Sequence, residues 1–288
     1  MLIKSSRIAI VFFKAIFFLQ ISNKNLYYKT QKALTYCIKF AKHIKKTFIR
    51  MNIKAQIPNL FTMLNLFCGC LALVMISENN FEWSFFFVCL GIFFDFFDGF
   101  FARKFNVAGP LGVQLDSLAD MVTSGVVPGF VMFKLMQDSD AFGTESYLPY
   151  LGFIITLGAC YRLAKFNIDT RQSDSFIGLP TPANALFFTS LPILPYVLHN
   201  NFDIDFSYNK WVLIVITFLS VYVMNAEIPL FSLKIKDFSF AKYKLQIFFL
   251  ALSVVMLIFL QILAVPLIII IYVLLSAINN IVTKKASN

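Results

Sequence analysis

The stretch FFDFFDGFFARKFNVAGPLGVQLDSLAD, residues 93–120, holds four aspartates in one of the most apolar neighbourhoods of the chain. These are Asp95, Asp98, Asp116 and Asp120, and the residues between them are rich in Phe and Leu. Carboxylates in such surroundings are costly to keep charged. The first question that the sequence raises is therefore what these four side chains bind.

The rest of the chain is equally apolar. Of its 288 residues 59% are hydrophobic and 36 are Phe, and its mean hydropathy of +0.75 exceeds that of a soluble globular domain. A membrane-spanning helix needs roughly 20 mainly apolar residues. About eight such runs occur, centred near residues 68, 91, 127, 157, 191, 221, 252 and 272. The sequence predicts an all-α, polytopic membrane helical bundle of about eight transmembrane helices.

The net charge of +10 is distributed as in a membrane protein, and it indicates no nucleic-acid partner. From residue 56 onward the chain has thirteen Lys and Arg. If all eight runs cross the membrane, only Lys134 and Lys210 fall near one side of it. The other eleven fall on the opposite side: Arg103, Lys104, Arg162, Lys165, Arg171, Lys234, Lys236, Lys242, Lys244, Lys284 and Lys285. The positive-inside rule makes that side cytoplasmic, and we expect the four aspartates and both termini there.

The first 55 residues differ from the rest, because they contain twelve Lys and Arg and no acidic residue. We expect residues 1–55 to form a basic cytoplasmic or interfacial segment, with an amphipathic helix at 7–21 as one form of it. An alternative is that translation begins at Met51, which would make this segment dispensable. Residues 56–232 are then expected to form the catalytic membrane domain, and residues 233–288 a C-terminal helical pair with a cytoplasmic tail.

Helix geometry predicts how the aspartates are arranged. Asp95 and Asp98 are three residues apart and Asp116 and Asp120 are four apart, so each pair shares one face of its helix. Two helices joined by a short loop are antiparallel neighbours, so the pairs can converge. Four like charges repel unless cations lie between them, and hard divalent ions take oxygen ligands that they share with phosphates. The sequence predicts two divalent ions that hold a diphosphate.

Small and basic residues accompany the carboxylates. Gly99 and Ala102 lie four residues after Asp95 and Asp98, and Gly112 lies four residues before Asp116, on the faces that carry the carboxylates. A ligand could approach the backbone there, and Arg103 could hold a phosphate through two hydrogen bonds. The alternatives are ordinary helix packing for the small residues and membrane anchoring for Arg103. For the aspartates the alternative is an ion or proton pathway, as in a divalent-cation transporter.

Eight of these residues, at fixed spacings, resemble the signature of the CDP-alcohol phosphatidyltransferase family: Asp95-x2-Asp98-Gly99-x2-Ala102-Arg103-x8-Gly112-x3-Asp116-x3-Asp120. The resemblance implies a core of six membrane helices and two divalent ions, Mg²⁺ or Mn²⁺. It implies that Asp95, Asp98 and Asp116 are metal ligands. Asp120 would be both a shared ligand and the catalytic base, and Gly99, Ala102 and Gly112 would pack against CDP. Members of the family are commonly dimers, which makes a homodimer an expectation.

Further stretches resemble the serine-using members of the family in bacteria and archaea. They are IPNLFTMLNLFCGCLAL at 57–73, LDSLADMVTSGVVPG at 115–129, YRLAKFNI at 161–168 and FIGLPTPANA at 176–185. The resemblance implies an enzyme of a bacterial-type inner membrane, with its active site on the cytoplasmic side. Lys165 stands where an Arg is expected, which leaves the role of that position open. Arg162 could hold the carboxylate of L-serine.

Histidine chemistry is disfavoured, because the chain has two His and neither lies in a His-Lys-Asp arrangement. The resemblance then implies direct, metal-assisted attack of the serine hydroxyl on CDP-diacylglycerol, a phospholipid precursor, with release of CMP. Alternatives with the same chemistry use glycerol 3-phosphate or inositol phosphate as the acceptor.

Overall fold

The structure is a computed structural model that describes residues 53–138, 147–169, 176–230 and 244–286. The expectations about the basic N-terminal segment and a start at Met51 lie outside the described residues. Apart from Ile53, the described residues belong to one compact unit, Lys54–Asn288. The boundary that we place at residue 232 stays a prediction.

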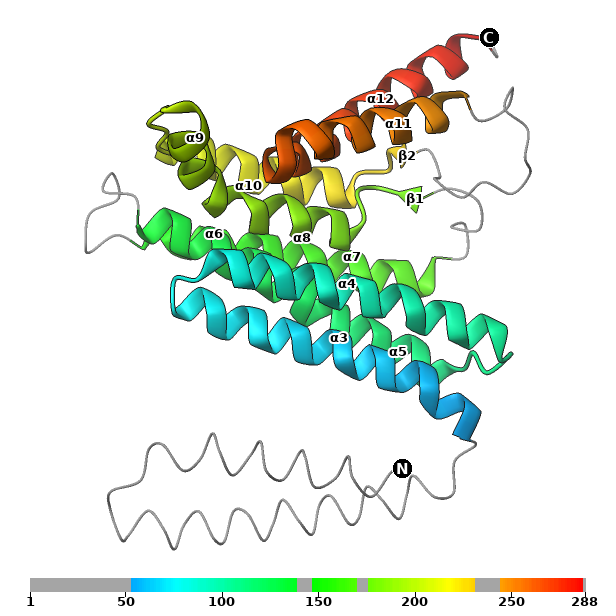
Figure 1. The fold of residues 1–288 in the computed structure, drawn as a ribbon. Helices are drawn as coiled ribbons and strands as arrows, with labels where there is room; N and C mark the ends of the chain where they lie inside the picture. Colours follow the sequence, from blue (N-terminus) through cyan, green and yellow to red (C-terminus); the bar gives the residue numbers. More distant parts are fainter. Residues whose placement is uncertain (1–52, 139–146, 170–175, 231–243, 287–288) are drawn as a thin grey trace, which may run out of the picture. The chain divides into compact units, whose positions relative to one another are not determined.

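Helices make up nearly all of the described chain, and one short pair of strands accompanies them (Figure 1). The α-helices are α3 (Ile53–Ser77), α4 (Phe81–Lys104), α5 (Pro110–Asp120), α6 (Val127–Gln137), α7 (Ile154–Ile168), α8 (Thr181–Ser190), α9 (Leu194–Phe202), α10 (Lys210–Asn225), α11 (Lys244–Leu260) and α12 (Ala264–Ala286). Shorter helical segments are η1 (Met121–Val126), η3 (Leu148–Phe153), η4 (Leu191–Ile193) and η5 (Gln261–Leu263). Strands β1 (Phe176–Ile177) and β2 (Pro229–Leu230) pair antiparallel.

Helices α3 and α4 form an antiparallel hairpin through a turn of two Asn residues. Asn79 has a φ of 56°, a left-handed conformation that Asn tolerates better than most residues. The next residue, Asn80, caps α4, because its side chain accepts a hydrogen bond from the backbone N–H of Trp83 at 3.3 Å. This turn places the polar face of α3 beside the aspartates of α4.

The apolar run centred near residue 127 forms one long helix that is interrupted in its middle. Gly109 caps α5 and Pro110 fills its first position, where the missing N–H costs nothing. Directly after Asp120 the helix widens into the π-helical segment η1, and it returns to α-helical geometry at Val127, next to Pro128. Such π-helical turns occur frequently at functional sites. Here the turn follows the last of the four aspartates.

The connections divide between two ends of the helical unit (Figure 1). The α4–α5 connection, the C-terminal end of α7 and the strand pair lie at one end. The α3–α4 turn, the C-terminal end of α6 and helix α9 lie at the other. Arg103 and Lys104 lie in the last turn of α4 and Lys165 in the last turn of α7, so basic residues gather at the first end. The assignment of this end to the cytoplasm stays a prediction.

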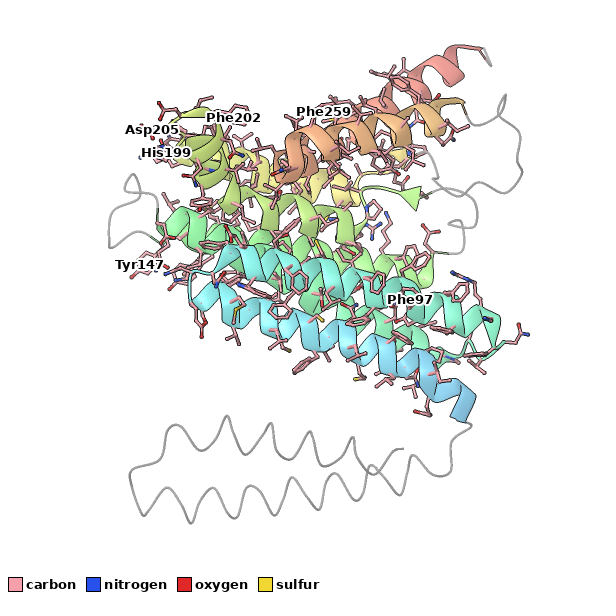
Figure 2. All side chains as sticks on the ribbon, in the orientation of Figure 1. Phe97, Tyr147, His199, Phe202, Asp205 and Phe259 are labelled. Atoms are coloured by element: carbon pink, nitrogen blue, oxygen red, sulfur yellow. The ribbon has the colours of Figure 1, made fainter. Side chains whose placement is uncertain are left out.

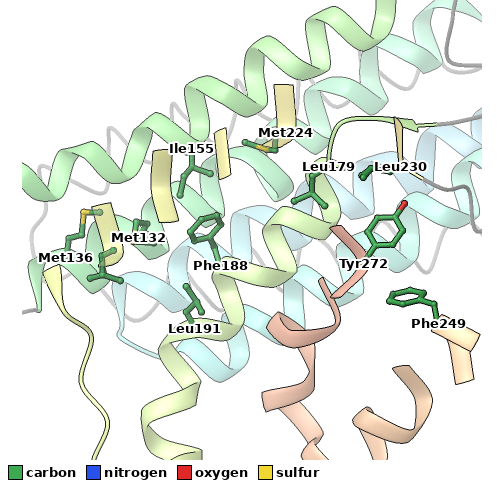
Figure 3. Close-up of a cluster of buried hydrophobic side chains, with 11 residues drawn as sticks. Met132, Met136, Ile155, Leu179, Phe188, Leu191, Met224, Leu230, Phe249 and Tyr272 are labelled. Atoms are coloured by element: carbon green, nitrogen blue, oxygen red, sulfur yellow. The ribbon is translucent and has the colours of Figure 1, made fainter. Parts of the chain in front are cut away.

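The largest core lies where α6, α7, α8 and α10 meet, and helices α11 and α12 extend it (Figure 3). Phe188 of α8 is fully buried among the side chains of this core, which include Met132, Ile155 and Leu213. On the far side of α8, Tyr272 of α12 packs against Phe249 of α11, with ring centroids 5.5 Å apart. This core holds α7 and α10 together.

Five candidate membrane spans occur in the described ranges: Gln56–Ser77, Phe81–Lys104, Pro110–Gln137, Leu148–Ile168 and Leu245–Ile281. The last includes both α11 and α12, which pack side by side as an antiparallel pair after a turn at Gln261, whose φ is 49° (Figure 1). The chain is therefore an all-α, polytopic integral membrane protein. The number of eight crossings is not confirmed, because the run near 191 is broken into α8, η4 and α9. Helix α10 has 16 residues and would be only about 24 Å long.

Candidate active site

Three of the four predicted aspartates converge at the α4–α5 end of the unit. One carboxylate oxygen from each of Asp95, Asp98 and Asp116 lies within 4.8 Å of the other two. Asp98 is buried, while Asp95 and Asp116 are half-buried. We call these three residues the aspartate cluster. The helical spacing predicted this convergence, since each residue lies on the face of its helix that meets the other.

Asp98 is held by a hydroxyl from the neighbouring helix. Thr62 of α3 is 2% exposed, and its Oγ1 donates a hydrogen bond to Asp98 Oδ2 at 2.6 Å. The same hydroxyl lies 3.2 Å from the carbonyl oxygen of Pro58, one turn earlier in α3. A hydroxyl has one proton, so the shorter contact with the charged acceptor is the stronger bond. Thr62 therefore fixes the orientation of the Asp98 carboxylate.

Asp120 lies beside the cluster and has its own partner. Asn65 Nδ2 on α3 donates a hydrogen bond to Asp120 Oδ1 at 3.1 Å. The charge of Asp120 is repelled by Asp95 and attracted by Arg162 of α7. Asp120 does not belong to the group of oxygens within 4.8 Å of one another, but it is close enough to the cluster for its charge to act on Asp95.

Close packing fixes Asn65 in its position. Thr123 Oγ1 in η1 donates a hydrogen bond to the carbonyl oxygen of Asn65 at 3.1 Å. A side-chain carbon added at Gly91 would lie 2.9 Å from both Asn65 Oδ1 and Thr123 Cγ2, so only glycine fits there. Helices α3, α4 and the segment η1 meet closely around Asn65, which positions its amide against Asp120.

Two glycines of the predicted site have open space beside them, unlike Gly91. A Cβ added at Gly99 would have Arg103 Nη1, 3.8 Å away, as its nearest neighbour. One added at Gly112 would have only Asn59 Oδ1 within 4 Å, at 3.8 Å. Within the described ranges only one side chain comes within 4 Å of a Cβ at either position, so both have room for a ligand. The space lies on the helix faces that carry the aspartates, and Ala102 is half-buried one turn beyond Asp98.

The two predicted arginines lie in different surroundings. Arg103 is exposed at the end of α4, its guanidinium lies beside Gly99, and its charge is attracted by Asp98. Arg162 of α7 is 8% exposed, and its Nε is buried with no hydrogen-bond partner in the described part of the chain. It lines a small pocket together with Lys165, which forms an ion pair with Glu227 at 3.5 Å. Arg162 thus lines this pocket and is also attracted by the charge of Asp120.

The donor set of the aspartate cluster fits a hard divalent cation. It consists of three carboxylate groups, and no His or Cys belongs to it within the described ranges. Mg²⁺ and Mn²⁺ prefer oxygen ligands of this kind, whereas zinc sites usually contain nitrogen or sulfur. Oxygens that lie about 2.0–2.1 Å from one Mg²⁺ can be at most about 4.2 Å apart, so oxygens separated by as much as the 4.8 Å limit would have to move closer together to share an ion.

Sequence reasoning missed Thr62 and Asn65 as parts of the site. The signal was present, because Asn59, Thr62 and Asn65 recur every three residues and form a polar stripe on an otherwise apolar helix. Another polar pair belongs to a different region: His199 Nδ1 and Asp205 Oδ1 are 3.0 Å apart near α9, at the end opposite the α4–α5 connection (Figure 2). Both are exposed, so this pair is a surface contact.

The comparisons with known proteins agree with this geometry. The profile of the CDP-alcohol phosphatidyltransferase family matches residues 55–222, which contain the four aspartates and Arg162. The CDP-diacylglycerol–serine O-phosphatidyltransferase of Bacillus subtilis is 37% identical over 147 residues, which cover 48% of this chain and 78% of the relative. The protein of the same name in Helicobacter pylori is 31% identical over 207 residues, covering 71% of this chain and 81% of the relative.

A third relative has a different name. The archaetidylserine synthase of Methanothermobacter thermautotrophicus is 30% identical over 138 residues, covering 46% of this chain and 56% of the relative. The family profile spans more than half of the 288 residues. On this match, with the signature aspartates gathered in one cluster, the chain belongs to the CDP-alcohol phosphatidyltransferase family.

Proposed function

We propose that this protein transfers the phosphatidyl group of CDP-diacylglycerol to the hydroxyl of L-serine and releases CMP. The observation that carries the proposal is the convergence of Asp95, Asp98 and Asp116 beside Asp120, at the end of the unit where basic residues gather. The names of the relatives support serine as the acceptor, because two are CDP-diacylglycerol–serine O-phosphatidyltransferases and one is an archaetidylserine synthase.

The aspartate cluster would hold Mg²⁺ or Mn²⁺, and Asp120 would share a second ion with it. When bound, such ions neutralise a diphosphate and stabilise the charge that develops on the leaving oxygen. Thr62 keeps the Asp98 carboxylate turned toward the cluster, and Asn65 does the same for Asp120. Hydrogen bonds of this kind orient metal ligands and increase their affinity for the ion.

Open space and positive charge define where CDP would bind. The positions beside Gly99 and Gly112 leave room for the nucleotide against the helix backbone, with Ala102 in the same region. Arg103 lies next to Gly99 and is exposed, so its guanidinium can reach a phosphate of the ligand. The diacylglycerol chains would remain in the membrane, beside the exposed apolar side chains of α4 and α5.

Asp120 is proposed as the general base. It accepts the proton of the serine hydroxyl, and the serine oxygen then forms a bond to the β-phosphorus of CDP-diacylglycerol. The bond from that phosphorus to the bridging oxygen breaks, and CMP leaves with this oxygen. Asn65 holds Asp120 without occupying both of its oxygens, because the described hydrogen bond uses Oδ1. Arg162 would bind the serine carboxylate, since a guanidinium matches a carboxylate in two parallel hydrogen bonds.

The position in the cell follows from the charges. We place the site on the cytoplasmic side of a bacterial-type inner membrane, supported by Arg103, Lys104 and Lys165 at the same end as the aspartate cluster. Assembly as a homodimer stays a prediction from the family resemblance.

The test is an assay of CMP release by the purified, reconstituted protein. The reaction should require CDP-diacylglycerol, Mg²⁺ or Mn²⁺, and L-serine, and it should fall by orders of magnitude in Asp98→Asn. The control Asp203→Asn changes an exposed carboxylate at the end of α9 and should retain activity. Faster CMP release with glycerol 3-phosphate or inositol phosphate than with serine would refute serine as the acceptor. Cation flux without CMP release would refute the proposed transfer of the phosphatidyl group.

A further inference from the structure

A small pocket lined by Arg162 lies between the end of α7, the strand β1 and the end of α10. Its lining residues are Arg162, Lys165, Phe166, Ile177, Met224 and Asn225. Asn225 is the last residue of α10 and lies just beyond the segment 55–222 that the family profile matches. The pocket thus contains two residues, Met224 and Asn225, from outside the region by which the family was identified.

Two polar atoms of this pocket are buried without a hydrogen-bond partner among the described residues. One is the donor Nε of Arg162, and the other is the acceptor Oδ1 of Asn225. Leaving a buried polar atom unpaired costs free energy, so such pairs of atoms usually have a ligand or water as their partner. An unpaired cationic donor and an unpaired neutral acceptor in one pocket suit a ligand that carries both a negative group and a hydrogen-bond donor.

The orientation of the Asn225 amide is fixed by the chain itself. Its Nδ2 donates hydrogen bonds to the carbonyl oxygens of Gly158 at 3.2 Å and Val221 at 3.0 Å. An amide rotated by 180° would place Oδ1 against these two acceptors, which would repel it. The amide nitrogen therefore faces the carbonyls of α7 and α10, and Oδ1 is left as an acceptor.

We propose that Asn225 determines acceptor specificity by accepting a hydrogen bond from the α-ammonium group of the incoming serine through Oδ1. This proposal rests on the proposed function, in which Arg162 holds the serine carboxylate. The ion pair of Lys165 with Glu227 supports it, because Glu227 offsets the positive charge of Lys165, which would otherwise repel the ammonium group. An acceptor with neither an ammonium group nor a second hydroxyl, such as 3-hydroxypropionate, would leave Oδ1 unpaired and would be disfavoured.

The experiment compares L-serine with 3-hydroxypropionate, which is serine without its amine. The unaltered protein should use 3-hydroxypropionate with a kcat/KM lower by about tenfold or more, since a hydrogen bond to a charged group changes affinity by about tenfold to a hundredfold. In Asn225→Leu, which has nearly the same shape, the KM for serine should rise by a similar factor. The kcat/KM for 3-hydroxypropionate and the KM for CDP-diacylglycerol should change less than twofold.

Two further variants separate this role from a structural one. Asn225→Asp keeps an acceptor oxygen but loses the bonds to Gly158 and Val221, so it should retain the preference for serine. Asn184→Leu removes a buried Asn that also joins two helices, because Asn184 Oδ1 accepts a hydrogen bond from Ser220 of α10 at 2.6 Å. Asn184→Leu should lower thermal stability without changing the ratio of the kcat/KM values for serine and 3-hydroxypropionate.

Each outcome decides one question. If the unaltered protein does not use serine, the proposed function fails. If it uses serine and 3-hydroxypropionate equally well, the proposed role of Asn225 is refuted. This comparison needs only the unaltered protein, so it holds even if Asn225→Leu does not accumulate in the membrane. The role also fails if Asn225→Leu keeps the full preference for serine, or if Asn225→Asp and Asn225→Leu lose activity equally with both acceptors.

Discussion

Replacing Thr62 by Val tests whether α3 helps to hold the metal site. The two residues have nearly the same shape, so the change removes the hydroxyl without leaving a cavity. The hydrogen bond that is lost joins Thr62 Oγ1 to Asp98 Oδ2 at 2.6 Å, and both residues are buried, with 2% and 7% exposure. A buried bond to a charged acceptor contributes about 1.5–3 kcal/mol.

This free energy corresponds to a weaker affinity for the divalent ion by about tenfold to a hundredfold, the range found for partners of metal ligands. The assay follows CMP release at saturating CDP-diacylglycerol and serine while the Mn²⁺ concentration is varied. The Mn²⁺ concentration at half-maximal activity should rise by that factor in Thr62→Val. The maximal rate at high Mn²⁺ should recover to within a fewfold of the unaltered protein, because no ligand atom has been removed.

The matched control is Thr217→Val in α10. Thr217 is also fully buried in a helix, and its Oγ1 donates to the carbonyl oxygen of Leu213, one turn earlier, at 2.8 Å. Thr62 likewise contacts the carbonyl oxygen of Pro58, so both changes remove a contact within the helix, and only Thr62→Val removes a bond to an aspartate. An unchanged Mn²⁺ requirement in Thr62→Val, or an equal rise in Thr217→Val, would refute the reasoning.

Three more changes test the site. Asp120→Asn should abolish turnover while CDP-diacylglycerol still binds, and an equal loss of binding in a direct binding assay would contradict its role as the base. Arg162→Lys should raise the KM for serine and leave that for CDP-diacylglycerol unchanged, whereas equal defects in steady-state kinetics would make Arg162 a structural residue. Gly99→Ala should weaken CDP-diacylglycerol binding without lowering the melting temperature. Gly158→Ala should lower the melting temperature, because its Cβ would lie 2.8 Å from a methyl group of Val221, and the reverse pattern would contradict the open space at Gly99.

Helical periodicity was enough to predict the aspartate cluster from the sequence. Residues three or four apart share a face, and a short connection makes two helices antiparallel neighbours, so the sequence predicted that the two aspartate pairs could converge, and Asp95, Asp98 and Asp116 do, while Asp120 lies outside the cluster of oxygens. Arg162 and Lys165 are likewise three residues apart on α7, and both line one pocket. Local spacing carries this information because the helix itself sets the geometry.

Contacts between distant segments could not be predicted in this way. Asn65 and Asp120 are 55 residues apart, and Asn225 and Gly158 are 67 apart, so these pairs depend on how the helices pack. The π-helical turn after Asp120 is also absent from the periodic pattern, since Pro110–Gln137 reads as one uninterrupted apolar run. This turn changes the helix phase between Asp120 and the buried Thr123, which bonds to Asn65.

Electrostatic repulsion supports the proposal that these aspartates form a binding site. Two charges 4.8 Å apart repel by about 3 kcal/mol at an effective dielectric constant of 20. Three such pairs would offset much of the roughly 5–15 kcal/mol by which a typical domain is stable. Thr62 and Asn65 each bond to a carboxylate, but neither carries the positive charge that would reduce the repulsion within the cluster. Arg162 is attracted to Asp120 and Arg103 to Asp98, while Asp95, Asp98 and Asp116 still face one another. We therefore propose that a cation held among the three would stabilise the fold and create the site for the diphosphate by the same interaction.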